Sequence, residues 1–212
     1  MAAQAKICGL SSAATIGAAV AAGASHIGFI FFPPSPRNLG LDQAAALAAR
    51  VPDHIGRVGV FVDPDDELVE RAIAAARLTA IQLHGREDPG ATAAFARHRV
   101  ELWKAIPIRT RADLAAGRTY KGIADRLLYD AKAPAGSALP GGMGLRFDWK
   151  LLDGFAHPLP WALSGGLDAD NVADAIGLTG AQLVDVSSGV ESAPGVKDVD
   201  KIAAFMQAVA RS

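Results

Sequence analysis

Two side chains that can move protons lie at the ends of short apolar stretches. Cys8 closes the stretch 5–8, and Asp130 follows the stretch 127–129. A cysteine thiolate can act as a base or a nucleophile, and a carboxylic acid in a partly desolvated site can donate a proton. Each also has an ordinary explanation, because a lone cysteine is often a small buried side chain and an aspartate often closes a turn. We interpret Cys8 and Asp130 together as a candidate base and a candidate acid.

Two glycine-containing turns have the composition of an anion-binding site. Ser164-Gly165-Gly166 comes just before a predicted helix that begins near residue 168, and Ser187-Ser188-Gly189 follows the apolar stretch 183–186. Glycine lets backbone N–H groups approach an anion closely, and the N-terminus of a helix adds a favourable dipole. The pair predicts a phosphate held by Gly165, Gly166, Ser188 and Gly189. The alternative is two tight turns that bind nothing.

Arg37 and His84 are candidates for binding the rest of a substrate. Arg37 follows the stiff segment Pro33-Pro34-Ser35-Pro36, and its planar guanidinium suits a carboxylate. His84 follows the stretch 80–83 and either donates a hydrogen bond in the site or simply ends a strand. The histidines and acidic residues do not have the spacing of a metal site, so we do not predict a metal.

These side chains can meet only if the fold brings the ends of the apolar stretches together. Short stretches rich in β-branched or aromatic residues recur at 5–8, 27–32, 57–62, 80–83, 102–106, 127–129, 161–163 and 183–186. Helical stretches alternate with them, at 13–22, 41–50, 65–77, 91–98, 111–116, 149–155, 168–176 and 199–210. Consecutive apolar positions indicate strands buried on both faces. Eight βα units in this length predict an α/β fold with one domain over residues 1–212, a (β/α)8 TIM barrel.

A doubly wound open sheet is the competing architecture. The first predicted strand is not followed by a glycine-rich dinucleotide-binding turn, which favours the barrel. In a barrel, the residues that follow the strands line one mouth, where the active sites of this fold lie. The long segment 131–146, which contains Gly141, Gly142 and Gly144, follows a strand, so we expect it to form a loop on that mouth.

Strand alternation makes a further structural prediction at the first strand. If Cys8 points into the mouth of the barrel, Lys6 must point into the barrel one layer below. A lone buried ammonium group is costly, so Lys6 needs a partner. Asp185 interrupts the apolar stretch 183–186, which neighbours the first strand when the barrel closes. We predict a buried Lys6–Asp185 pair; the alternative is that Asp185 accepts hydrogen bonds from the backbone or from Ser187.

Composition narrows the class of protein. The chain has 212 residues, a formal net charge of -1, 50% hydrophobic residues and 20% charged residues, which indicates a globular core and argues against an electrostatic nucleic-acid binder. Cys8 is the only cysteine, so an internal disulfide is excluded. The segment 13–24 is too short to span a membrane, and the first six residues do not resemble a signal peptide. We expect a cytoplasmic protein, a monomer or weak homodimer, that binds a small phosphorylated molecule.

The sequence closely resembles the phosphoribosylanthranilate isomerase family of tryptophan biosynthesis. The resemblance extends from the first predicted strand to the start of the last helix. Its matching segments are 6–9, 28–31, 35–37, 58–62, 82–85, 130–132, 141–144, 147–149, 163–167, 184–191, 194–195 and 197–198. The chain departs mildly from the family pattern at Ser11, where threonine is common, and at Met143, where a hydroxyl residue is common.

The resemblance implies an Amadori rearrangement of N-(5-phosphoribosyl)anthranilate to 1-(2-carboxyphenylamino)-1-deoxyribulose 5-phosphate. It implies that Asp130 protonates the furanose ring oxygen and that the Cys8 thiolate removes the C2 proton. It also implies that Arg37 pairs with the anthranilate carboxylate and that the two glycine turns hold the phosphate. Because the substrate nitrogen serves as the electron sink, no cofactor is needed.

Two alternatives compete with this interpretation. The histidine-pathway isomerase performs the same rearrangement on a related barrel, but it is expected to carry a carboxylate where Cys8 stands and a visible half-barrel repeat, and neither occurs here. The other alternative is a barrel that binds a phosphorylated ligand without turnover.

Overall fold

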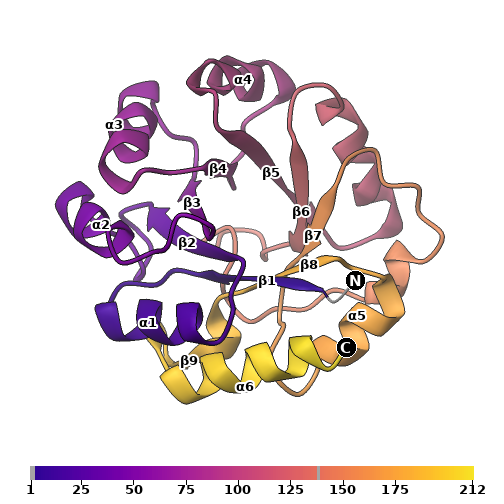
Figure 1. Ribbon diagram of the computed structural model, residues 1–212. Coiled ribbons are helices and arrows are strands. Elements are labelled where there is room, and N and C mark those ends of the chain that lie inside the picture. The colour runs from indigo at the N-terminus through magenta and orange to yellow at the C-terminus, as the bar shows by residue number, and fades with distance from the viewer. Residues whose placement is uncertain (1–2, 138) are drawn as a thin grey trace.

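A closed barrel of parallel strands forms the centre of the molecule (Figure 1). The structure is a computed structural model that describes residues 3–137 and 139–212. Within these residues eight strands pair in chain order: β1 (Gln4–Cys8), β2 (His26–Phe31), β3 (Gly56–Phe61), β4 (Ala80–Leu83), β5 (Glu101–Ile108), β6 (Arg126–Ala131), β7 (Trp161–Leu163) and β8 (Leu183–Val186). Strand β8 pairs with β1, so the predicted barrel is confirmed and the open-sheet alternative is wrong.

Helices surround the barrel, one after each strand or nearly so (Figure 1). The α-helices are α1 (Ala13–Ala21), α2 (Leu41–Ala48), α3 (Asp66–Ala76), α4 (Pro89–Ala94), α5 (Val172–Thr179) and α6 (Val199–Ala210). Short 3-10 helices complete the ring: η1 (Phe95–His98), η2 (Arg111–Tyr120), η3 (Trp149–Leu152) and η4 (Ser188–Val190). Side-chain caps begin several of them; for example, Asp65 accepts a hydrogen bond from the backbone of Leu68 at the start of α3.

Four of the predicted helices differ from the observed ones. The stretch 91–98 is divided between the end of α4 and the 3-10 helix η1. The stretches 111–116 and 149–155 form the 3-10 helices η2 and η3, and η3 ends before Gly154, whose φ of 60° no helix residue adopts. The stretch 168–176 becomes helical only at Val172. Asp168 forms a turn of its own instead, because its carboxylate accepts hydrogen bonds from the backbone N–H groups of Asp170 and Asn171.

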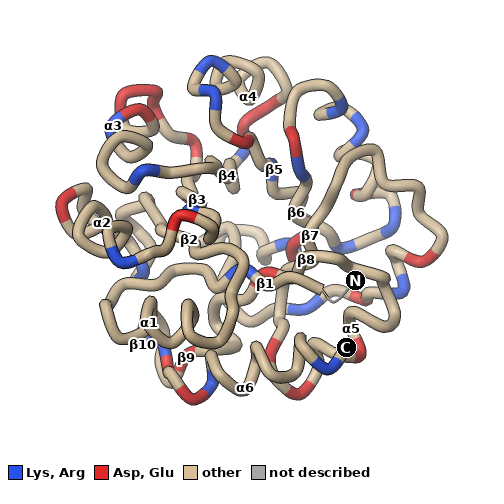
Figure 2. The backbone as a smooth tube through the Cα atoms, in the orientation of Figure 1, with Lys and Arg blue, Asp and Glu red and all other residues tan. Residues whose placement is uncertain are grey.

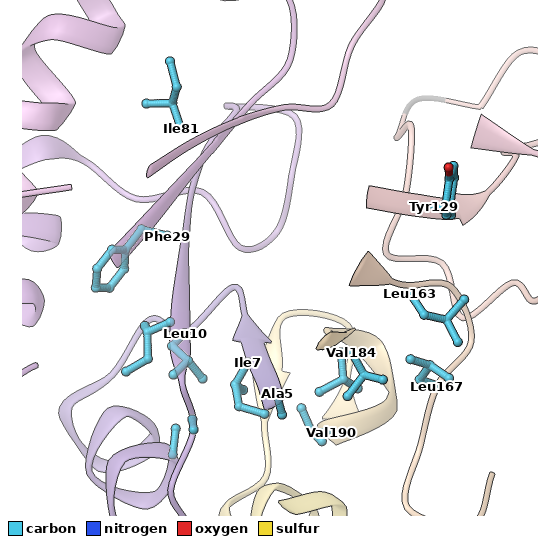
Figure 3. Close-up of a cluster of buried hydrophobic side chains, with 14 of the residues drawn as sticks. Ala5, Ile7, Leu10, Phe29, Ile81, Tyr129, Leu163, Leu167, Val184 and Val190 are labelled. Carbon is cyan, nitrogen blue, oxygen red and sulfur yellow. The ribbon is translucent and has the colours of Figure 1, made fainter. Parts of the chain in front are cut away.

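Both faces of the strands are buried, and each face contributes to a separate apolar cluster. One cluster fills the inside of the barrel and consists of Val58, Ala80, Trp103, Ala105, Leu128, Ala162 and Leu183. The other lies between the strands and the helices; Figure 3 shows part of it around β1 and β8, including Ile7, Val184 and Val190. Every second side chain of a strand points into the barrel. The inward-pointing residue nearest the carboxyl end of each strand therefore faces the mouth of the barrel.

Charged residues of both signs are distributed around the outer elements of the molecule (Figure 2). The described residues contain no helix that is both long enough and apolar enough to cross a membrane. A short hairpin that the sequence analysis did not predict, β9 (Glu191–Ala193) and β10 (Val196–Lys197), follows β8. Its turn contains Gly195 at a φ of 81°. This hairpin carries two charged residues of the site described below.

Candidate active site

Most of the predicted site residues line one pocket at the carboxyl ends of the strands. Seven of the eight lie in its wall: Cys8, Arg37, His84, Asp130, Gly165, Gly166 and Ser188. The eighth, Gly189, does not line the pocket but packs beneath it, and a Cβ atom there would collide with the carbonyl oxygen of Leu167. The two glycine turns are therefore in direct contact with each other, as a shared anion site requires.

The long loop after β6 forms one side of this pocket. Residues 139–145 all line it, and Ala138 lies outside the described residues. A Cβ atom on Gly141 would lie 2.5 Å from Asp130 Oδ2, and one on Gly142 would lie 2.9 Å from Arg37 Nη1. The two glycines therefore let the loop backbone approach both functional side chains. The predicted position of this loop on the mouth of the barrel is confirmed.

Cys8 lies at the carboxyl end of β1 and is only 6% exposed. Gly28 on the neighbouring strand makes room for it, since a Cβ atom there would lie 2.8 Å from Cys8 Sγ. Burial raises the pKa of the Cys8 thiol above its ordinary value, although the ammonium group of Lys6 acts to lower it. The neutral thiol is therefore the major form of Cys8 in the free protein at neutral pH, and the thiolate is the minor form.

Lys6 and Asp185 form a buried ion pair one layer below Cys8. The two residues are register partners where β8 meets β1, and Lys6 Nζ donates a hydrogen bond of 2.9 Å to Asp185 Oδ1. Burial acts to lower the pKa of Lys6, but the charge and hydrogen-bond interactions with Asp185 and Cys8 together outweigh burial, and this pKa lies above its ordinary value. Lys6 therefore carries a positive charge beneath the thiol. The pair predicted from strand alternation is confirmed.

Asp130 is held at the end of β6 by two hydrogen bonds. Its Oδ1 accepts from the backbone N–H of Ala131 at 2.9 Å, and its Oδ2 lies 3.1 Å from His84 Nε2. His84 Nδ1 in turn lies 3.0 Å from Gln82 Nε2. Asp130 is 5% exposed, and its carboxyl group lines the pocket. His84, predicted as a binding residue, is thus placed against the candidate acid.

Arg37 is fixed from behind by Glu191 of the β9–β10 hairpin. Its Nε donates to Glu191 Oε1 at 2.7 Å and its Nη2 to Glu191 Oε2 at 2.8 Å, a two-point contact between guanidinium and carboxylate. Nη2 also donates to the carbonyl oxygen of Gly142 at 3.0 Å. Nη1 has no hydrogen-bond partner in the described part of the chain, so this edge of the guanidinium is available to a ligand.

Glu191 and Lys197 are functional residues that the sequence analysis missed. Lys197 Nζ donates to Glu191 Oε1 at 2.7 Å and to the backbone oxygen of Ser187 at 2.8 Å. Burial acts to raise the pKa of Glu191, but the hydrogen bonds from Arg37 and Lys197 outweigh burial and leave this pKa below its ordinary value. A signal was present: two opposite charges flank the Pro194-Gly195 turn directly after the predicted phosphate turn.

The turn after β7 presents backbone donors to the pocket. Gly165 and Gly166 have φ values of 92° and 64°, which residues other than glycine rarely adopt. The side-chain amide of Asn171 donates to the carbonyl oxygen of Gly166 at 3.0 Å and holds this conformation. Among the described residues, the backbone N–H groups of Gly165 and Gly166 donate no hydrogen bond. This turn therefore has N–H donors to offer an anion, and phosphate binding there stays a prediction.

The comparison with protein families gives a clear match. The model of the family described as N-(5'-phosphoribosyl)anthranilate (PRA) isomerase matches residues 5–208. A relative from Zymomonas mobilis subsp. pomaceae, named N-(5'-phosphoribosyl)anthranilate isomerase, is 56% identical over 211 residues, which cover 99% of each chain. A relative of the same name from Paramagnetospirillum magneticum is 47% identical and covers 97% of this chain and 96% of its own.

Solved structures agree with the sequence relatives. The phosphoribosyl anthranilate isomerase from Thermotoga maritima has a TM-score of 0.88 and 33% identity, with 98% of each chain covered. A phosphoribosyl anthranilate isomerase in complex with reduced 1-(o-carboxyphenylamino)-1-deoxyribulose 5-phosphate has a TM-score of 0.85 and 31% identity, again with 98% of each chain covered. On this sequence and structural evidence, the chain belongs to the N-(5'-phosphoribosyl)anthranilate isomerase family.

Proposed function

We propose that Asp130 and Cys8 are the general acid and the general base of the isomerase reaction of this family. The substrate is N-(5'-phosphoribosyl)anthranilate, and the product is 1-(2-carboxyphenylamino)-1-deoxyribulose 5-phosphate. One observation carries the assignment: a thiol, a carboxyl group, an arginine and two glycine turns from five different βα loops or strand ends meet in one pocket. This set matches a substrate that has two acid–base steps, a carboxylate and a phosphate.

The first step is the opening of the ribose ring. Asp130 in its protonated form donates a proton to the ring oxygen, the bond between C1 and that oxygen breaks, and the anthranilate nitrogen lone pair forms a C1=N bond. The nitrogen takes up the positive charge, so the step needs no cofactor. Asp130 is left as a carboxylate, and its Oδ1 and Oδ2 both have a donor nearby, from Ala131 and His84. These donors stabilise the charge that the step creates.

The second step is proton removal from C2. The Cys8 thiolate takes the proton, the electron pair forms a C1=C2 bond, and the C1=N electrons return to nitrogen. The resulting enol becomes the ketone when C1 gains a proton and the enol oxygen loses one. Burial raises the pKa of Cys8, so the step depends on a minor thiolate population, and the Lys6 ammonium beneath it favours that population.

Binding is divided between the two ends of the substrate. Arg37 offers Nη1 to the anthranilate carboxylate while Glu191 holds the other edge of the guanidinium. The backbone N–H groups of Gly165 and Gly166, with Ser188 and Gly189 behind them, bind the phosphate. Met143 lines the same pocket, but its thioether has no hydrogen to donate.

A turnover assay tests the proposal against its two alternatives. The fluorescence of phosphoribosylanthranilate should disappear when the purified chain is added, and the product should be the ketose. A chain that turns over only the histidine-pathway aminoaldose would support the first alternative. Binding of a ribose phosphate without loss of either substrate would support the second. The family match already favours the tryptophan-pathway reaction.

We further propose that residues 1–212 act as one barrel domain in the cytoplasm, as a monomer or weak homodimer. A reducing compartment suits a catalytic thiol, and a phosphorylated intermediate of amino-acid biosynthesis is available there. Sedimentation at micromolar and higher concentration measures the oligomeric state. A dimer that does not dissociate on dilution would contradict this part of the proposal.

A further inference from the structure

A line of three polar side chains, of which Gln82 and Asp130 are buried and His84 is partly buried, leads from the inside of the barrel to the pocket. Gln82 lies on β4 and His84 follows that strand, so their side chains are on the same side of it. Gln82 Nε2 is 3.0 Å from His84 Nδ1, and His84 Nε2 is 3.1 Å from Asp130 Oδ2. Gln82 is 1% exposed, and nothing in the proposed reaction uses it.

In the structure the amide nitrogen of Gln82, not its oxygen, faces His84 Nδ1, and this orientation is coupled to the position of the proton on His84. An amide nitrogen only donates, so Nδ1 must accept from it and remain unprotonated. A neutral imidazole then has its proton on Nε2, where it donates to Asp130 Oδ2. If the amide were turned over, its oxygen would face Nδ1, and Nδ1 would have to carry a proton.

The other end of the amide makes this residue unusual. Gln82 Oε1 is buried and has no hydrogen-bond partner among the described residues. A buried polar atom without a partner is costly and calls for an explanation. The contact with His84 is therefore the one hydrogen bond that orients the Gln82 side chain in the described part of the chain.

We propose that Gln82 is a positioning residue that keeps His84 neutral, with its Nε2–H directed at Asp130. This role rests on the proposed function of Asp130 as the general acid. A neutral Nε2–H occupies the side of Oδ2 that faces His84, so the acidic proton of Asp130 lies on the side that faces the pocket. An imidazolium would instead hold Asp130 as a carboxylate and remove the proton that ring opening needs.

Nitrogen NMR of histidine tests this role directly. In wild-type protein labelled with 15N-histidine, at neutral pH, the His84 signals should be those of a neutral ring protonated at Nε2; the His84→Asn variant identifies them. In Gln82→Glu, the new carboxylate can accept from Nδ1–H, so both nitrogens should be protonated. Because the acid is then held ionised, kcat should fall by at least about tenfold while KM changes by less than about threefold.

Gln82→Met is the second variant, because it keeps the length of the side chain but cannot donate. His84 should then lose its preference for the Nε2–H form, with a smaller loss of kcat than in Gln82→Glu. His157 is an internal control: its Nδ1 lies 3.2 Å from the Tyr129 hydroxyl, away from Gln82, so its signals should not move.

Two results would overturn the role of Gln82. One is a wild-type His84 that is protonated at Nδ1 while the enzyme is active. The other is a loss of kcat in Gln82→Glu and Gln82→Met with unchanged His84 signals, which would make the effect merely structural. Failure of the proposed function is a separate outcome, because it would appear as no turnover of phosphoribosylanthranilate by the wild-type chain.

Discussion

Two buried ion pairs lie at the pocket, and they differ in which charged group remains available to the site. Lys6 and Asp185 meet inside the barrel, where Lys6 is fully buried and its charge faces the thiol above it. Arg37 and Glu191 meet at the rim, where Glu191 binds one edge of the guanidinium and leaves another edge for a ligand. The inner pair fixes the position of the Lys6 ammonium group beneath the thiol. The outer pair fixes the orientation of the Arg37 guanidinium toward the pocket.

The difference follows from the elements that carry each pair. The inner pair joins register partners on two neighbouring strands, so its geometry is part of the sheet. The outer pair joins a loop after β2 to a hairpin after β8, and Lys197 adds a third charge. A pair that is built into strands contributes to folding, whereas a pair that is built from loops can be tuned for binding.

The largest expected effect is on stability and concerns the inner pair. Lys6→Met leaves the Asp185 carboxylate buried without its partner, which should lower the free energy of unfolding by about 3–5 kcal/mol. Denaturant unfolding measures it. The double variant Lys6→Met with Asp185→Leu is the control, because removing both charges should cost less than removing one. A single variant as stable as the wild type would show that the inner pair does not support the barrel.

The next effect is on turnover and concerns the two proposed proton-transfer groups, Cys8 above the inner pair and Asp130 across the pocket. Cys8→Ala and Asp130→Asn should each lower kcat by at least ~100-fold, because each removes one proton-transfer group. Steady-state assays with phosphoribosylanthranilate measure the loss, and circular dichroism checks that folding is kept. A variant that retains near wild-type turnover would remove its residue from the mechanism.

A smaller effect is expected on binding and concerns the outer pair. Arg37→Met should weaken binding of a ligand that carries the anthranilate carboxylate by roughly 10- to 100-fold, the worth of a charged hydrogen bond. Binding of a plain ribose phosphate should change little, because the two glycine turns recognise that part. Calorimetry with both ligands makes the comparison. An equal loss for both would mean that Arg37 serves the phosphate or the fold.

The smallest effect is a shift in the titration of Cys8. Burial raises the pKa of the thiol, so the ultraviolet absorbance of the thiolate should appear with a midpoint above the ordinary value of about 8.5. Since Cys8 is the only cysteine, Cys8→Ala gives the blank. The Lys6 charge lowers this pKa, so the midpoint should rise further in a folded variant that lacks Lys6. A midpoint below about 8.5 in the wild type would show that Lys6 outweighs burial.

The sequence predicted those parts of the molecule that depend on local pattern. All eight strands occur close to their expected positions, because a strand buried on both faces requires a run of apolar residues that no other element explains. The helices were placed less well at η2, η3 and the start of α5. At η3 and at the start of α5, the backbone of Gly154 and the turn made by Asp168 override the helical composition.

The candidate site was predicted wherever a residue follows a strand. Cys8, His84, Asp130 and the glycine turns belong to this class, because the barrel brings all strand ends to one mouth. Glu191 and Lys197 do not belong to it, since the hairpin that carries them has no apolar pattern of its own. Gln82 was not among the predicted site residues, because its proposed role depends on the contact of its amide with His84, which no sequence pattern reveals.

By itself, the sequence determined the barrel, the chemistry of the strand ends and the Lys6–Asp185 pair. The barrel follows from the periodicity of apolar stretches and the candidate chemistry from the residue types at their ends. The pair follows from alternation along β1 and closure against β8, which made Asp185 the best candidate partner for Lys6. Only the tertiary structure decided that Glu191 would hold Arg37 and that Gln82 would meet His84. The first contact joins residues 154 positions apart through two loops, and the second depends on one rotamer of a buried amide. Neither contact follows from a periodic pattern in the sequence, so only the packing of the folded chain could determine it.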